Sequence, residues 1–572
     1  MTQCQFCSES MRANARFCSS CGKPRSESIA TKPAKTKSKL GQDFSLSNAA
    51  TMGAHSPQHE FRSNNKIALP NAASIEAIRH TLFVLPEHFA ESFKSILLTF
   101  QIEPAGIIYS SNGACVVDRC QQILRDSSED KFRYVCIIGN WHEVPPLNVV
   151  NDFGMDDGDE YCQSDAFFGA MHPFNSSEPF SAIPEIPVGR IPVADRDIVM
   201  RVLGNDPDIS PTRNLFQFGV TAKCWEIASK EIVSSFPNMA AGVPHELLPQ
   251  DIRTLPKSAM ICSPEWTEFD FRRAAGAGPS DPFGLMYFNI HGGADEPQWV
   301  GEGENGDYVR IFEPSTIRDF QSAILVTEAC YGGALSYASP SIAETFFMNG
   351  GHSFVGSSTI AYGARATPIS AADLIAKHYI LGLYHGLTQG EALKIAKLEA
   401  LAEDPLSLEC GFKTVLSFNL FGAPWQRLVR TSDSSIATSF SSQRPIGSSV
   451  LDRVRAGLQK PRATEGSFVS EIRDKYRSRL PERDRQFMIQ SSEILTKLRE
   501  FKDFSRIMEV VSQSGSSLED LKLDFVSAGA GSVKGYRLIC SVNKSSKRKS
   551  TLILITDSLG KLTKTLVSKG SK

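Results

Sequence analysis

Two apolar stretches of the chain end on side chains that can do nucleophile and proton-transfer chemistry. The first, Leu285-Met-Tyr-Phe-Asn-Ile, is followed by His291, and the second, Ile324-Leu-Val-Thr-Glu-Ala, is followed by Cys330. Each stretch is typical of a buried parallel strand, and open α/β sheets build their sites at the carboxyl ends of such strands. We therefore expect His291 and Cys330 to form a catalytic pair.

The residue types explain what such a pair would do. A cysteine thiol is a weak nucleophile until it ionises, and a histidine beside it serves as base or imidazolium partner. Glycines after both residues let a substrate backbone approach closely, and the amides of Gly292 and Cys330 could form an oxyanion hole. For either residue alone, a packed core position is the alternative; the combination on two strand ends favours catalysis.

Residues 71–430 alternate between strand-like and helix-like runs, which predicts a doubly wound α/β sheet. Strands are expected at Phe132–Gly139, Ile186–Ile191, Leu215–Val220 and His352–Gly356, besides the two that end at His291 and Cys330. Helices are expected at Ser341–Met348, Ala371–Leu383 and Gly390–Ala402.

Four cysteines near the amino terminus have the spacing of a zinc site. Cys4 and Cys7 form one Cys-x-x-Cys pair, and Cys18 and Cys21 form a second. Paired knuckles of this kind supply four thiolates for tetrahedral Zn²⁺, and the segment has too few apolar residues to fold without metal. Residues 1–25 are therefore predicted to be a zinc ribbon with structural zinc; a redox or disulfide pair is the alternative. Such modules bind protein or nucleic acid, or only cap a terminus.

Composition bounds the class of protein. The chain has 572 residues, a net charge of −2 and 13 cysteines, an odd number. Such a small net charge does not indicate electrostatic binding to nucleic acid or to a membrane surface. The amino terminus lacks the apolar region of a signal peptide, and no apolar run is long enough for a transmembrane helix. We expect an intracellular, cytoplasmic protein with reduced thiols and no membrane partner.

The remaining segments differ from residues 71–430 in composition and in hydrophobic pattern. Residues 26–70 and the Ser-rich residues 431–450 indicate two flexible linkers. Residues 451–572 are predicted to be a small α+β domain of unknown role. It is expected to hold a charged helix at Glu482–Phe504 and a hairpin of Tyr536–Val542 and Thr551–Ile555.

Several of these motifs together resemble a known family. The strand–His–Gly and strand–Glu–Ala–Cys–x–Gly arrangement resembles the clan CD cysteine peptidases, which have a caspase-like fold. Ser164-Asp-Ala-Phe-Phe-Gly169, Pro184-Glu-Ile-Pro-Val-Gly-Arg190, Gly390-Glu-Ala-Leu393 and Phe418-Asn-Leu-Phe-Gly-Ala-Pro424 narrow the resemblance to gingipains, over about residues 75–430.

The resemblance implies a caspase-like α/β fold with Cys330 as nucleophile, His291 as its partner and Glu185 as the carboxylate that orients the histidine. Such a carboxylate fixes the imidazole tautomer and stabilises the imidazolium. A surface turn is the alternative for Glu185. Two features depart from the family: Ala423 replaces an aspartate of the last motif, and gingipains are secreted with signal and pro-segments.

Two weaker features bear on ligands. An acidic loop between residues 152 and 160 could hold Ca²⁺, because clustered carboxylates suit this ion. A solvated loop is favoured, and the spacing does not match an EF-hand. Asp195 and Asp197 could line a pocket for a basic side chain, and Trp299 and Tyr331 could wall it. A helix N-cap and core packing are the respective alternatives. The acidic loop comprises Asp152, Asp156, Asp157, Asp159 and Glu160.

The sequence therefore predicts an intracellular cysteine endopeptidase that cleaves protein substrates. Regulatory protein partners would bind the zinc ribbon or the carboxy-terminal domain, or the chain would cut itself in a flexible linker. The alternative is a zinc-ribbon adaptor with an inactive peptidase-like domain.

Overall fold

The structure is a computed structural model, and residues 1–65 and 66–572 form two compact units. In the first unit, strands β1 (Thr2–Gln3) and β2 (Ser10–Met11) pair antiparallel. The predicted zinc ligands Cys4, Cys7, Cys18 and Cys21 lie outside the described residues. The structure describes residues 2–3, 10–11, 69–110, 116–128, 130–151, 159–171, 182–204, 216–234, 260–262, 283–294, 297–302, 308–314, 317, 324–335, 340–384, 386–403, 408–428, 498–513, 522–527, 533–545 and 548–568.

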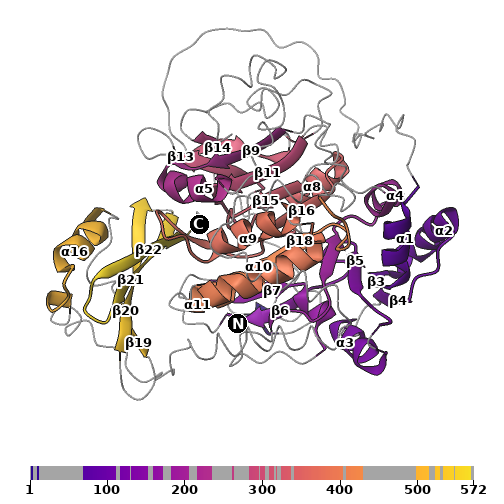
Figure 1. The fold of residues 1–572 in the computed structure, drawn as a ribbon, viewed down its shortest axis with the longest axis horizontal. Coiled ribbons are helices and arrows are strands. Elements are labelled where there is room, and N and C mark those ends of the chain that lie inside the picture. Colours follow the sequence, from indigo (N-terminus) through magenta and orange to yellow (C-terminus); the bar gives the residue numbers. More distant parts are fainter. Residues whose placement is uncertain are drawn as a thin grey trace, which may run out of the picture. The chain divides into compact units, whose positions relative to one another are not determined.

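A ten-stranded sheet organises the second unit, in the order β10-β9-β11-β15-β16-β18-β8-β5-β3-β4 (Figure 1). All neighbouring strands are parallel except β16 and β18, which are antiparallel. The sheet therefore consists of two parallel halves that run in opposite directions. Its strands are β3 (Thr81–Pro86), β4 (Gly106–Ser110), β5 (Tyr134–Ile138), β8 (Val188–Ile191), β9 (Phe216–Thr221), β10 (Met260–Cys262), β11 (Phe283–Asn289), β15 (Ile324–Thr327), β16 (Ser353–Ser357) and β18 (Phe418–Phe421).

Helices cover both faces of this sheet, which is why its strands are apolar throughout. Along β3, Leu82 and Val84 belong to one hydrophobic cluster, and Phe83 and Leu85 belong to another on the opposite face. The first face packs against α3 (Val116–Asp126), α5 (Glu226–Val233), α9 (Ala372–Tyr384), α10 (Gln389–Glu403) and α11 (Leu408–Ser417). The second packs against α1 (Ala72–Arg79), α2 (Ala90–Phe100), α4 (Arg196–Gly204) and α8 (Ile342–Met348).

Three smaller sheets flank the large one. β12 (His291–Gly292), β13 (Trp299–Glu302) and β14 (Tyr308–Phe312) form an antiparallel sheet directly after β11. β6 (Leu147–Val150) pairs with β7 (Tyr161–Ser164). The third has the order β17-β22-β21-β20-β19, and its strands are β17 (Tyr362–Ala364), β19 (Lys522–Ser527), β20 (Val533–Ser545), β21 (Arg548–Asp557) and β22 (Leu562–Ser568).

The mixed α/β architecture with a large, mostly parallel sheet is confirmed, and so are the three predicted helices of residues 341–402. The antiparallel junction of β16 and β18 was not anticipated. The predicted hairpin is present as β20 and β21. Of the helix expected at Glu482–Phe504, residues 482–497 lie outside the described residues, Leu498 and Arg499 are helical, and α16 (Phe504–Gln513) begins at its last residue. β22 pairs with β17, so the carboxy-terminal strands share a sheet with residues 362–364.

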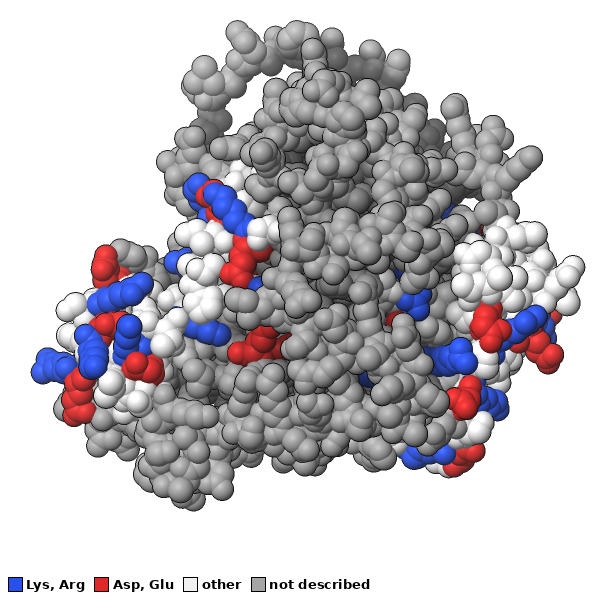
Figure 2. All heavy atoms as spheres, in the orientation of Figure 1, with Lys and Arg blue, Asp and Glu red and all other residues white. Residues whose placement is uncertain are grey.

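The described surface carries charges of both signs side by side. Figure 2 shows Lys and Arg intermixed with Asp and Glu on this face, in agreement with pairs such as Glu91–Lys94 and Glu226–Lys230. Among the described residues, no helix combines the length and apolar character needed to span a bilayer.

Candidate active site

The register of β11 and β15 brings the two predicted catalytic residues to the same level. Leu285 pairs with Ile324 and Phe288 with Thr327, an offset of 39 residues (324 minus 285). His291 and Cys330 differ by the same 39 residues (330 minus 291). Parallel neighbours lie about 4.8 Å apart, so both residues emerge together just beyond the carboxyl edge of the two strands.

A buried carboxyl group ties the two strand ends together. Glu328, fully buried, accepts a hydrogen bond of 2.5 Å from the Tyr287 hydroxyl, and its backbone N–H donates to the Phe288 carbonyl at 2.8 Å. Burial, followed by the nearby Glu328 charge, raises the pKa of Tyr287 well above its ordinary value. The phenol therefore stays protonated and remains a donor to Glu328.

Two aromatic rings hold the His291 imidazole. Trp225 packs against it with ring centroids 4.4 Å apart, and Tyr308 meets it edge-on at 4.7 Å. His291 is only 2% exposed. Trp225 follows β9, the neighbour of β11, and Tyr308 begins β14 of the small sheet after β11, so two different sheets contribute to fixing the ring.

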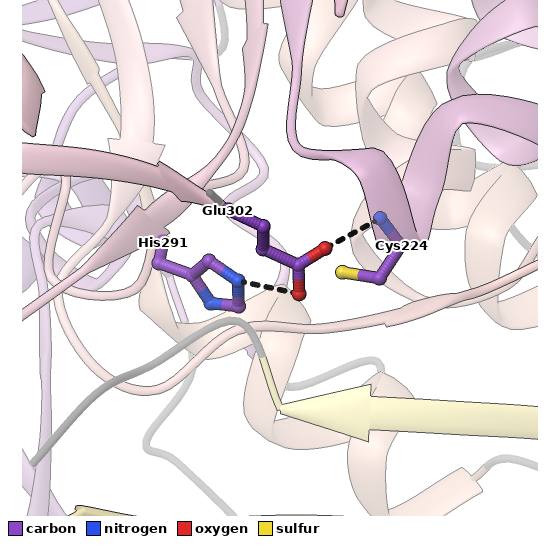
Figure 3. A group of neighbouring side chains, drawn as sticks. All are labelled: Cys224, His291 and Glu302. Atoms are coloured by element: carbon purple, nitrogen blue, oxygen red, sulfur yellow. Dashed lines mark hydrogen bonds and ion pairs between the residues drawn. The ribbon is translucent and has the colours of Figure 1, made fainter. Parts of the chain in front are cut away.

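Glu302 is the carboxylate beside this imidazole. Its Oε1 lies 3.4 Å from His291 Nε2, and its Oε2 accepts a hydrogen bond of 2.9 Å from the Cys224 backbone N–H. Figure 3 shows the carboxylate between the imidazole and Cys224, with the Cys224 sulfur pointing toward the group. Cys224 lies in the single 3₁₀ turn Lys223–Trp225 after β9. The donor atoms of Cys224, His291 and Glu302 all lie within 4.8 Å of one another.

Cys330 is fully buried, and its sulfur contacts the backbone of Ala361. The Ala361 N–H donates to Sγ at 3.1 Å, and the thiol faces the Ala361 carbonyl at 3.4 Å. The Ala361 N–H can stabilise negative charge on the sulfur, whereas burial and the neighbouring carbonyl favour the neutral thiol. Residue 361 directly precedes β17.

The glycines of the two motifs serve the packing of backbone against backbone. A Cβ at Gly292 would lie 2.1 Å from the Cys330 carbonyl oxygen, and one at Gly333 would lie 2.5 Å from the Gly356 carbonyl oxygen. We had expected these glycines to admit a substrate; the described contacts show that they admit neighbouring loops of the chain itself.

Tyr331, next to the nucleophile candidate, is held by a buried ion pair. Its backbone has a φ of 55°, and its hydroxyl donates to Asp159 at 2.5 Å. The same carboxylate accepts from Lys413 Nζ at 2.6 Å and from the Ile360 N–H at 2.9 Å. Asp159 is thus a structural anchor rather than part of a solvated loop. Asp152, Asp156 and Asp157 of the predicted acidic loop lie outside the described residues.

Glu185 is placed away from His291. It precedes β8, which is four strands from β11 in the sheet, or roughly 19 Å at about 4.8 Å per strand. Its side chain is exposed and accepts a hydrogen bond from the Met171 N–H at 2.8 Å. The carboxylate beside His291 is therefore Glu302 and not Glu185.

The strings that carried the family resemblance meet in a buried cluster. Asp165 accepts two hydrogen bonds from the guanidinium of Arg190, at 2.6 and 2.7 Å, and Arg190 is fully buried. The Asp165 N–H donates to the Asn419 side chain at 2.9 Å. These motifs therefore brace β8 and β18 rather than form the site.

Three of the four pocket residues have structural positions. Asp195 accepts hydrogen bonds of 3.0 Å from the Asp197 and Ile198 N–H groups and so caps α4. That helix follows the carboxyl end of β8, at the sheet edge opposite the site, because β8 runs against β15. Trp299 is 2% exposed and stacks on Phe312. The alternatives, a helix cap and core packing, are therefore the better descriptions, and only Tyr331 lies beside the site.

Sequence reasoning missed Glu302, Cys224, Trp225 and Tyr308. A signal for Glu302 was available, because a hairpin after His291 places Val300 opposite it and residue 302 on the same face as Val300. Cys224 and Trp225 follow a predicted strand adjacent to β11, but strand order cannot be read from sequence.

Comparisons with known proteins give a family match over part of the chain. Residues 110–205 match Peptidase family C25. The match supports the gingipain resemblance at the family level, over a segment that holds Asp165, Glu185 and Arg190 but neither His291 nor Cys330. Among solved structures, the Arg-specific cysteine proteinase gingipain R (RgpB) is similar, with a TM-score of 0.44 and 13% identity over 62% of this chain and 79% of that chain. The complex of Porphyromonas gingivalis RgpB pro- and mature domains gives a TM-score of 0.41 and 13% identity over 62% of this chain and 80% of that one. No curated protein matches the chain.

Proposed function

We propose that the protein is a cysteine endopeptidase of the gingipain type, with Cys330 as nucleophile, His291 as acid and base, and Glu302 as the carboxylate that orients His291. The observation that carries this proposal is the register of β11 and β15, which brings His291 and Cys330 to the same level just beyond the ends of these adjacent parallel strands. The Ala361 N–H at Cys330 and the carboxylate at His291 support the assigned roles.

In the first step, His291 takes the proton of the Cys330 thiol, and the sulfur forms a bond to the scissile carbonyl carbon as the carbonyl π electrons move to the oxygen. The amides of Gly292 and Cys330 hold the oxyanion. His291 then gives its proton to the leaving nitrogen as the carbon–nitrogen bond breaks, which leaves an acyl-enzyme. In the second step, His291 takes a proton from water and the hydroxyl adds to the carbonyl. The carbon–sulfur bond then breaks, and His291 returns the proton to the sulfur, which restores the thiol and releases the acid product.

A peptide-library cleavage assay with wild type and Cys330→Ala tests the proposal. We expect cleavage by wild type, none by Cys330→Ala, and retained cleavage by Cys262→Ala, a control at a cysteine on β10. An electrophilic peptide ketone should modify Cys330, as mapped by mass spectrometry. Labelling of Cys224 instead, with full activity in Cys330→Ala, would overturn the assignment, because Cys224 also lies near His291. If the wild-type chain cleaves no peptide and neither cysteine is labelled, the alternative of an adaptor with an inactive peptidase-like domain is favoured.

We also propose that the activity is gated by the carboxy-terminal strands. Cys330 is fully buried under Ala361, and β17, which starts at the next residue, is paired along its length with β22. Movement of this segment would expose the sulfur to a substrate carbonyl. Removal of residues 562–572 should therefore raise the cleavage rate; an unchanged rate in a folded deletion variant argues against gating.

We further propose a structural zinc ion, regulatory partners, activation by self-cleavage and an intracellular location. The predicted ribbon cysteines would hold structural zinc. The ribbon or the carboxy-terminal strands would bind regulatory protein partners. Self-cleavage in residues 26–70 or 431–450 is a second route to activation, and intact-mass comparison of wild type with Cys330→Ala after incubation tests it. An intracellular setting is supported by the odd cysteine count.

A further inference from the structure

The cluster around the candidate histidine has a composition that the peptidase reaction does not require. Cys224 contributes a second thiol beside His291 and Glu302, and the three donor atoms lie within 4.8 Å of one another. Orientation of an imidazole needs only the carboxylate. A thiol, an imidazole nitrogen and a carboxylate oxygen converging from three strand ends also form a ligand set for a transition metal.

We propose that Cys224, His291 and Glu302 bind a divalent transition metal of the Zn²⁺ class, and that the bound metal inhibits the peptidase by occupying His291. The metal site itself stands on geometry alone. The inhibitory consequence rests on the proposed function.

The distances fit tetrahedral zinc after small side-chain movements. With bonds of about 2.1 Å to nitrogen and oxygen, tetrahedral ligand atoms lie about 3.4 Å apart, and a sulfur ligand lies about 3.6 Å from a nitrogen one. The His291 Nε2 to Glu302 Oε1 distance is 3.4 Å. Because the donor atoms lie within 4.8 Å of one another, the sulfur must approach by at most about 1.2 Å (4.8 minus 3.6), within reach of rotation about the Cys224 Cα–Cβ bond.

The surroundings hold the ligands in place. The Cys224 N–H binds the second oxygen of Glu302, so the carboxylate is fixed without losing Oε1. Trp225 and Tyr308 restrain the imidazole between them. Hydrogen bonds and packing around first ligands raise metal affinity, because less ordering remains to be done on binding. Cys224 and Glu302 are partly exposed, which leaves a route for the metal and for a fourth ligand such as water.

The ligand types also select the metal. Thiolate and imidazole suit zinc and its neighbours, whereas Ca²⁺ and Mg²⁺ take oxygen ligands. Zinc bound through His291 Nε2 would occupy the nitrogen that faces Glu302 and would remove the histidine from proton transfer. Inhibition should therefore be relieved by a chelator and should not be produced by Ca²⁺.

Metal binding is measured first, in full-length Cys330→Ala, so that catalysis is not needed for the readout. Zinc equivalents per chain are counted after gel filtration, and Co²⁺ titration is followed by thiolate-to-cobalt absorption. Adding Cys224→Ser should remove one zinc equivalent and weaken the cobalt band. Cys262→Ser in the same background is the matched control and should keep both. Glu302→Gln should also lose one zinc equivalent. Agreement between the two variants shows that the loss does not come from misfolding of one of them.

Inhibition is then measured in chains that keep Cys330, with each variant compared with its own zinc-free rate. The zinc concentration for half inhibition should rise by at least roughly 10- to 100-fold in Cys224→Ser, since loss of a ligand costs at least as much as loss of its supporting contacts. Equal zinc equivalents and equal inhibition in Cys224→Ser and Cys262→Ser would overturn the proposal. Zinc binding by a chain that cleaves no peptide would refute the proposed function and leave the metal site standing.

Discussion

The substitution Glu302→Gln tests the positioning of the catalytic histidine. It removes the charge beside His291 and keeps an oxygen that can accept from the Cys224 N–H. At 3.4 Å, two unit charges attract by about 5 kcal/mol for an effective dielectric constant of about 20. The side chains are 2% and 15% exposed. Solvent screening and the retained amide hydrogen bond reduce the loss by about half, to roughly 2–3 kcal/mol.

That loss applies to the imidazolium formed during catalysis, so it lowers kcat/KM by roughly 30- to 150-fold. The assay is steady-state cleavage of one fluorogenic peptide by wild type, Glu302→Gln and Glu185→Gln. The Glu185 variant is the matched control, because its carboxylate binds the Met171 N–H instead, and it should retain wild-type kcat/KM. Full activity in Glu302→Gln, or an equal loss in Glu185→Gln, would refute the assignment.

Three other substitutions test close packing at the site and buried charges elsewhere in the second unit. Gly292→Ala should abolish most cleavage, because its Cβ would lie 2.1 Å from the Cys330 carbonyl oxygen, whereas Gly411→Ala, with 3.9 Å to its nearest neighbour, should leave cleavage intact. Burial lowers the pKa of the Lys397 amine to about 7 from 10.5, so its charge destabilises the fold fully below pH 7 and progressively less as the pH rises toward 10.5. Lys397→Met should therefore increase the free energy of unfolding by on the order of 4 kcal/mol near pH 6 and least near pH 10; denaturant titrations with the opposite trend would contradict this. Lys413→Met leaves a buried carboxylate without its cation and should cost roughly 3–5 kcal/mol, measured as a lower urea midpoint; an unchanged midpoint would show that the pair contributes nothing.

The sequence by itself determined the elements that carry His291 and Cys330. Strong apolar runs specify buried strands whatever their neighbours, and the equal offsets of 39 residues reflect a register that hydrophobic pattern enforces. Local signals also specified the helices of residues 341–402 and the hairpin of β20 and β21.

Only the tertiary structure decided which residues surround the histidine. Strand order depends on the packing of helices on both sheet faces, and no local pattern records that β9 lies beside β11 while β8 lies four strands away. That order brings Cys224 and Trp225 to His291 and keeps Glu185 from it. The hairpin after β11 supplies Glu302, because antiparallel pairing folds residue 302 back over residue 291. Side chains that meet across strands are therefore fixed by long-range pairing, whereas the strands themselves are fixed by their own residues.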